Sequence, residues 1–105
     1  MNLGMAQRSF TLCVADLIIH AYEMGYEMTF GDAYRDPRVE YGHPNSTHRF
    51  RLAVDLNLFK DGKYLASTED HRPLGEWWEQ QHPLAKWGGR FMDGNHYSFE
   101  WQGVA

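Results

Sequence analysis

Residues 52–65, LAVDLNLFKDGKYL, decide the fold class, because they predict a strand that turns back on itself. In residues 52–59, leucine and valine alternate with small or polar side chains, which is typical of a strand with one face in a core. The pair Asp61-Gly62 has the composition of a tight hairpin turn. We therefore expect an antiparallel hairpin, with Tyr64 and Leu65 on the returning strand.

A helix and another strand are predicted before this hairpin. Residues 9–25 carry apolar side chains at spacings of three and four, which predicts an amphipathic helix that Ser9 caps and Gly25 ends. Residues 26–35 alternate like a strand and lead into a turn-rich loop at residues 36–45. The helix side chains expected to face the sheet are Phe10, Val14, Leu17, Ile18, Ala21 and Tyr22.

The last third of the chain predicts a short helix and a final strand. Residues 73–81 begin with proline, which suits a first helical turn, and carry Leu74, Trp77 and Trp78 on one side. We favour core packing over sugar stacking for the two tryptophans. Aromatic and polar residues alternate in residues 96–101, HYSFEW. The sequence thus predicts an α+β fold with a small antiparallel sheet, one long N-terminal helix and a short second helix.

Length and composition limit the class of protein. With 105 residues and 43% hydrophobic content, the chain is expected to form a single domain, residues 1–105, without disulfides. The only cysteine, Cys13, lies in an apolar run and is predicted to be a core residue. A net charge of −4 argues against nucleic acid as a partner. The apolar run at residues 10–19 is half a membrane span and contains Asp16, so we expect neither membrane insertion nor a signal peptide.

Two polar side chains are predicted to lie on one face of the sheet. Asp55 projects from its strand opposite the leucines, and the small side chain of Ala53 leaves room for an ion. His96 begins the last strand on the face opposite its aromatic residues. If these strands are neighbours, Asp55 and His96 can share a metal ion. Zinc in a hydrolytic site takes three protein ligands of this kind and keeps one position open for water.

His48 is the natural third ligand, but it lies seven residues before Asp55. An odd separation puts two residues on opposite faces of a regular strand, so the segment must bend, and we expect residues 49–51 to absorb the change of direction. Asp93 lies in a turn three residues before His96. A carboxylate there can hold a water molecule and take its proton as the bond to a substrate carbonyl forms.

Each of these residues also has an ordinary interpretation. A single histidine in a small domain is usually a hydrogen-bonded or exposed polar residue, and six histidines offer many accidental pairings. Asp55 could be a surface residue, and Asp93-Gly94 could be only a hairpin turn. Spacing alone therefore leaves open whether the chain binds a metal.

Two motifs resemble those of one family of zinc peptidases. Residues 46–48, Ser-Thr-His, and residues 53–55, Ala-Val-Asp, resemble the SxHxxGxAxD motif of the zinc-dependent D-alanyl-D-alanine carboxypeptidases, the vancomycin-resistance dipeptidases and the phage L-alanyl-D-glutamate endolysins. Residues 93–96, Asp-Gly-Asn-His, are similar to the second motif of this family, an acid three residues before the last histidine. One departure is Arg51, which stands where the motif has glycine.

The resemblance implies a role for each matching residue and a Hedgehog/DD-peptidase-like fold. It implies that Zn²⁺ is bound by His48, Asp55 and His96. Asp93 would be the general base. Arg35 would hold the substrate or polarise its carbonyl, and Ser46 would contact the peptide.

The implied activity is hydrolysis of the stem peptide of the bacterial cell wall. An aspartate as base resembles the endolysin branch, so L-Ala-D-Glu is the expected bond, with D-Ala-D-Ala carboxypeptidase as the close alternative. Two other interpretations are a non-catalytic zinc-stabilised wall-binding module and a small α+β protein without metal. A peptidase made in the cytoplasm without a signal peptide would reach the wall after release, through a holin or by lysis from without.

Overall fold

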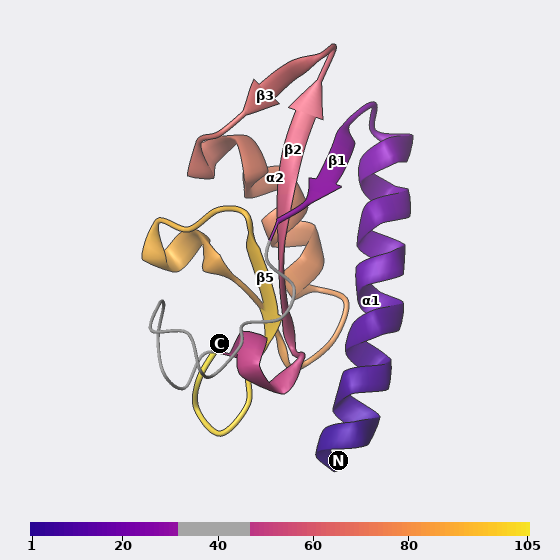
Figure 1. Cartoon of the computed structure of the whole chain (residues 1–105), viewed down its shortest axis with the longest axis vertical. Coiled ribbons are helices and arrows are strands. Elements are labelled where there is room, and N and C mark those ends of the chain that lie inside the picture. Colours follow the sequence, from indigo (N-terminus) through magenta and orange to yellow (C-terminus); the bar gives the residue numbers. More distant parts are fainter. Residues whose placement is uncertain (32–46) are drawn as a thin grey trace.

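The computed structural model describes residues 1–31 and 47–105. In these residues the chain forms two α-helices, two short 3-10 helices and a five-stranded antiparallel sheet (Figure 1). The sheet order is β1-β2-β5-β4, and β3 pairs with β2. The elements are α1 (Leu3–Glu23), β1 (Glu27–Phe30), η1 (Thr47–Phe50), β2 (Ala53–Lys60), β3 (Lys63–Leu65), α2 (Thr68–Glu79), β4 (Ala85–Trp87), η2 (Gly88–Phe91) and β5 (His96–Phe99). The α+β class predicted from the sequence is confirmed.

Helix α1 begins earlier than the sequence predicts. Asn2 caps it by accepting a hydrogen bond of 2.8 Å from the backbone N–H of Met5, and Ser9 lies inside the helix. Its sheet-facing side chains are Ala6, Phe10, Leu17 and Ala21, with Val14 and Ile18 partly buried beside them. Tyr22 is 48% exposed, and its hydroxyl accepts a hydrogen bond of 3.1 Å from the N–H of Met28 in β1, so it lies at the edge of this face and not in the core. Gly25 follows the helix with a φ of 90°, as expected of the residue that ends it.

The predicted hairpin is confirmed in β2 and β3. Lys60 pairs with Lys63, and the turn between them has a φ of 52° at Asp61 and 76° at Gly62. Positive φ at both central residues is the turn geometry that Asp-Gly favours. Burial alternates along β2, with its leucines and Val54 in the core.

Helix α2 also begins earlier than predicted. Ser67 and Asp70 form a capping box, in which each side chain accepts a hydrogen bond from the backbone of the other residue. Pro73, the predicted start, lies inside the helix, where it cannot donate to the carbonyl of Glu69. The local capping signal at residues 67–70 therefore overrides the preference of proline for a first turn.

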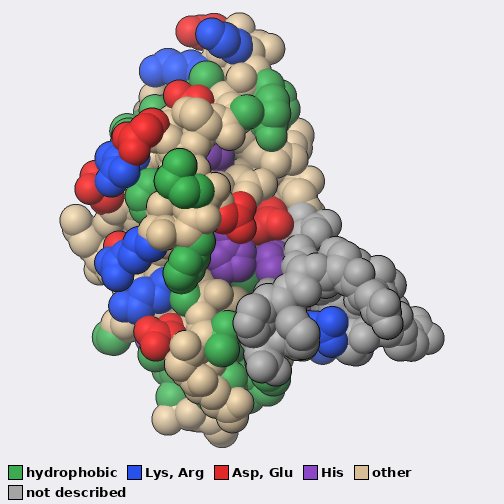
Figure 2. Space-filling view, turned by 90° about the vertical axis from the view of Figure 1, so that its left-hand side faces the viewer, with side chains coloured by type: hydrophobic (Ala, Val, Ile, Leu, Met, Phe, Trp, Pro, Cys, Tyr) green, Lys and Arg blue, Asp and Glu red, His purple; other side chains and the backbone are tan. Residues whose placement is uncertain are grey.

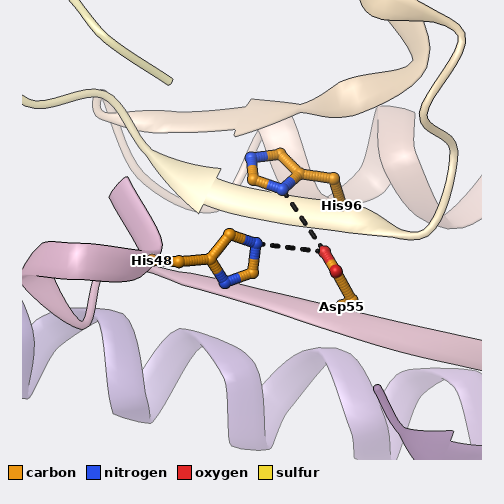
Figure 3. A group of neighbouring side chains, drawn as sticks. All are labelled: His48, Asp55 and His96. Atoms are coloured by element: carbon orange, nitrogen blue, oxygen red, sulfur yellow. Dashed lines mark ion pairs between the residues drawn. The ribbon is translucent and has the colours of Figure 1, made fainter. Parts of the chain in front are cut away.

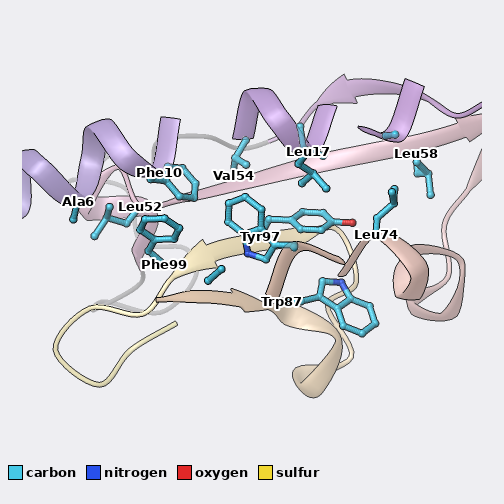
Figure 4. Packing of buried hydrophobic residues seen from close by; sticks show 14 residues of the cluster. Ala6, Phe10, Leu17, Leu52, Val54, Leu58, Leu74, Trp87, Tyr97 and Phe99 are labelled. Carbon is cyan, nitrogen blue, oxygen red and sulfur yellow. The ribbon is translucent and has the colours of Figure 1, made fainter. Parts of the chain in front are cut away.

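Both helices cover the same face of the sheet, and the hydrophobic core lies between them and the strands (Figure 4). Trp78 is fully buried there, and its indole N–H donates to the carbonyls of Lys86 and Ser98. Trp77 and Cys13 are partly buried against this core. The tryptophans therefore pack as predicted. Strand β4, which the sequence does not predict, is held to the core through Trp78 and is too short for a recognisable period.

No α-helix among residues 1–31 and 47–105 combines the length and the apolar character that crossing a membrane requires.

Candidate metal centre

Strands β2 and β5 place Asp55 and His96 side by side. The two residues are register partners, one position along from the partners Val54 and Tyr97, which face the core. Because successive side chains of a strand point to opposite faces, Asp55 and His96 project from the face away from the helices. The Oδ1 atom of Asp55 lies 3.3 Å from Nδ1 of His96 (Figure 3).

The bend predicted before β2 brings in His48. His48 lies in η1, and the chain closes this turn with a hydrogen bond of 2.9 Å from the N–H of Leu52 to the carbonyl of Thr47. Arg51 turns the backbone into the strand with a φ of 56°, in the left-handed region. As a result, Nε2 of His48 lies 3.3 Å from the same Oδ1 atom of Asp55.

The three side chains form a compact group that could hold a metal ion. One ligand atom from each of His48, Asp55 and His96 lies within 4.8 Å of the others. The two imidazole rings are buried, whereas the Asp55 side chain is 16% exposed, so the group reaches solvent on one side. Figure 2 shows histidine and acidic side chains together on the surface opposite α1. The spacing in the sequence left open whether His48, Asp55 and His96 meet, and in the fold they do.

The positions of the donor atoms are compatible with a shared cation. Oδ1 of Asp55 is buried and accepts no well-formed hydrogen bond from the described residues, although two imidazole nitrogens lie 3.3 Å away. Buried carboxylate oxygens rarely lack a hydrogen-bond partner. Ligand atoms bonded at about 2.0–2.1 Å to a tetrahedral ion lie about 3.3 Å apart, which equals both nitrogen–oxygen separations. The two separations from Asp55 are thus those expected of ligands that share one ion.

Asp55 is ionised at neutral pH. Burial alone would raise the pKa of its carboxyl, but the favourable interaction with the His48 and His96 imidazoles, each 3.3 Å from Oδ1, outweighs this and lowers the pKa from 3.8 to about 2. A carboxylate that keeps its charge in a largely buried position is the form that binds a cation.

Asp93 lies in the turn that leads directly into β5. Its backbone N–H donates to the carbonyl of Gly88 at 3.0 Å, and its own carbonyl accepts from the N–H of His96 at 3.1 Å. The residue is exposed and does not belong to the three-residue group. Asp93 is thus tied through its backbone to a proposed ligand while its carboxylate stays accessible to water.

Three further residues hold this turn in place. A Cβ atom at Gly88 would lie 2.3 Å from the carbonyl oxygen of Asp93 and 2.7 Å from Cβ of His96, so no side chain fits there. A Cβ atom at Gly94 would lie 2.6 Å from the backbone of α2. The indole N–H of Trp87 donates to the carbonyl of Gly94 at 2.8 Å. The glycines mark a turn in the sequence, but these tertiary contacts are visible only in the fold.

The two predicted substrate contacts, Arg35 and Ser46, lie outside the described residues 1–31 and 47–105.

No protein-family model matches the chain, and no curated protein matches it in a sequence search.

Arg51 permits a test of the bend that delivers His48. A side chain in the left-handed region costs about 1–2 kcal/mol relative to glycine. We expect Arg51→Gly to be more stable than Arg51→Ala by about 1 kcal/mol in denaturant unfolding, because the two variants lose the same arginine contacts and differ mainly in backbone freedom. Equal stability of the two variants would show that the φ of 56° is not required.

Proposed function

We propose that the protein is a zinc-dependent peptidase that cleaves the stem peptide of bacterial peptidoglycan, at the L-Ala-D-Glu bond. The observation that carries this proposal is the convergence of His48, Asp55 and His96 around one point with a side open to solvent. The order and spacing of these residues and Asp93 resemble the wall peptidases, which supports the choice of substrate.

The donor set favours zinc over the other common divalent ions. Two imidazole nitrogens and one carboxylate oxygen suit Zn²⁺, whereas Mg²⁺ and Ca²⁺ prefer oxygen ligands throughout. Structural zinc sites usually have four protein ligands and catalytic sites three, and residues 1–31 and 47–105 bring together three. A zinc ion in such a site lowers the pKa of a coordinated water to about 7.

In this proposal Asp93 moves the proton. Its exposed carboxylate accepts a proton from the attacking water as the bond between the water oxygen and the scissile carbonyl carbon forms. It then gives that proton to the amine nitrogen as the carbon–nitrogen bond breaks. Arg35 and Ser46 are assigned to substrate binding on the motif alone. The enzyme would be made in the cytoplasm and act on the wall after release, with the help of a holin or by lysis from without.

Digestion of purified peptidoglycan tests the proposal. We expect the zinc-loaded protein to release fragments that carry a new N-terminal D-Glu, as read by mass spectrometry, and we expect a zinc chelator to stop the release and added Zn²⁺ to restore it. Release of free D-Ala alone would assign the carboxypeptidase activity instead. A zinc-loaded protein that releases nothing from walls of several stem-peptide types would contradict a hydrolytic function.

A further inference from the structure

Helix α1 carries a second, largely apolar row that the core does not use. We call this row the α1 seam; its members, all exposed, are Met5, Arg8, Leu12, Ala15, Ile19 and Tyr22. Leu12 is 64% exposed and Ile19 is 58% exposed. Figure 1 shows α1 on the outer side of the molecule, with the sheet and α2 on its other side. The seam therefore lies mostly on the side of α1 away from the core, and at its end the Tyr22 hydroxyl bonds to the backbone of Met28 in β1.

The spacing of the seam matches that of a helix–helix interface. Its positions alternate between steps of three and four residues, which is the heptad spacing of the a and d positions in coiled coils. Such a row stays in one narrow stripe along the helix, where a second helix can cover it. Single exposed apolar residues are common on protein surfaces, whereas here four large apolar side chains, Met5, Leu12, Ile19 and Tyr22, lie along one stripe.

We propose that two copies of this chain associate through the α1 seam, with the two α1 helices antiparallel. The charges beside the seam favour a second copy in this orientation. Arg8 lies in the first half of the helix, and the exposed acids Asp16 and Glu23 flank the seam in the second half. An antiparallel pair centred between Leu12 and Ala15 places Arg8 between Asp16 and Glu23 of the second copy. A parallel pair would place the two Arg8 side chains against each other.

Apolar surface beside the seam extends the same interface. A groove of about 130 Å³ lies between α1 and β1, with Ile18, Tyr22, Met28 and Phe30 in its lining. In the antiparallel register Met5 of the second copy lies opposite Tyr22, at the edge of this groove. Phe30, which is 68% exposed in a single chain, lies where the second copy can cover it.

The dimer leaves both metal centres open. The α1 seam and the group of His48, Asp55 and His96 lie on opposite sides of the sheet, so pairing of the helices does not cover the proposed active sites. The interface consists mainly of one helix from each chain and is smaller than the standard protein interface, so we expect a dissociation constant in the micromolar range.

Sedimentation of the full chain from about 5 to 500 μM tests the proposal. We expect a monomer–dimer equilibrium that Leu12→Glu and Ile19→Glu each abolish without loss of helical circular dichroism. Tyr64→Glu is the matched control, because Tyr64 is 53% exposed on β3, away from the seam, and it should leave the equilibrium unchanged. A monomer at every concentration would overturn the proposal. So would a monomer that binds lipid vesicles through Leu12, since the seam would then serve a membrane surface.

Charge reversal tests the orientation. Arg8→Glu should weaken the dimer about tenfold at low ionic strength, and combining it with Asp16→Lys and Glu23→Lys should restore the affinity. In a parallel dimer Arg8→Glu alone would change little, and that result would overturn the antiparallel arrangement. Leu12→Glu should hydrolyse peptidoglycan at the wild-type rate per chain, so failure of either proposal leaves the other standing.

Discussion

Replacement of Asp93 by alanine is expected to lower the rate of peptidoglycan hydrolysis by about 10²–10⁴-fold while the protein keeps its metal. The carboxylate is exposed and outside the group of converging ligand atoms, so its removal takes away the proposed proton acceptor and none of the three proposed metal ligands. The turn should keep its shape, because backbone hydrogen bonds to Gly88 and His96 hold it. Release of soluble wall fragments gives the rate, and elemental analysis of the same sample gives the zinc content.

Asp93→Asn is the matched control for this experiment. The amide keeps the size of the side chain and its exposed position but cannot take a proton at neutral pH. Equal losses in Asp93→Ala and Asp93→Asn would therefore assign the effect to proton transfer and not to packing. A wild-type rate in Asp93→Ala would place the base elsewhere in the chain. Loss of zinc from Asp93→Asn would show that this carboxylate binds the ion.

The fold class and the hairpin could be predicted because local patterns determine them. The alternation in residues 52–59 specifies which face of β2 is buried, and the Asp-Gly pair fixes the return of the chain. Once β2 and β5 are taken as neighbours, the alternation also places Asp55 and His96 on one face. A regular strand would put His48 and Asp55 on opposite faces, so a bend between them was predicted. The positive φ of Arg51 provides this bend.

The remaining features depend on tertiary contacts that local patterns do not contain. Both helices begin upstream of their predicted starts. The side chains of Asn2 and Ser67 accept hydrogen bonds from free N–H groups of the first turns, so the helices can begin there. Strand β4 has three residues, and its partner β5 determines it more than its own sequence does. The hydrogen bond from the indole N–H of Trp87 to the carbonyl of Gly94 forms only when the tertiary fold brings the two residues together.

Replacement of His48 by alanine should remove the metal and the activity together. Loss of a hydrogen bond that merely supports a metal ligand already costs about 10–100-fold in affinity, so loss of the ligand itself should cost more. A metal that binds only the folded chain stabilises it by about 4 kcal/mol at 1,000 times its dissociation constant. We therefore expect added Zn²⁺ to raise the thermal midpoint of the wild-type protein clearly and that of His48→Ala hardly at all.

His20→Ala is the matched control for the loss of one imidazole. His20 lies on α1, which covers the face of the sheet opposite the metal group, and its ring stacks on Trp77 with the ring centroids 4.1 Å apart. This variant should keep the zinc-dependent rise in thermal midpoint and the wall hydrolysis. If His48→Ala kept the same rise, the ion would not depend on His48, and the convergence at Asp55 would be an ion pair between a carboxylate and imidazoles. Asp93→Ala is expected to keep the zinc-dependent rise in thermal midpoint, whereas His48→Ala is expected to lose it. Comparison of the two variants therefore separates metal binding from catalysis.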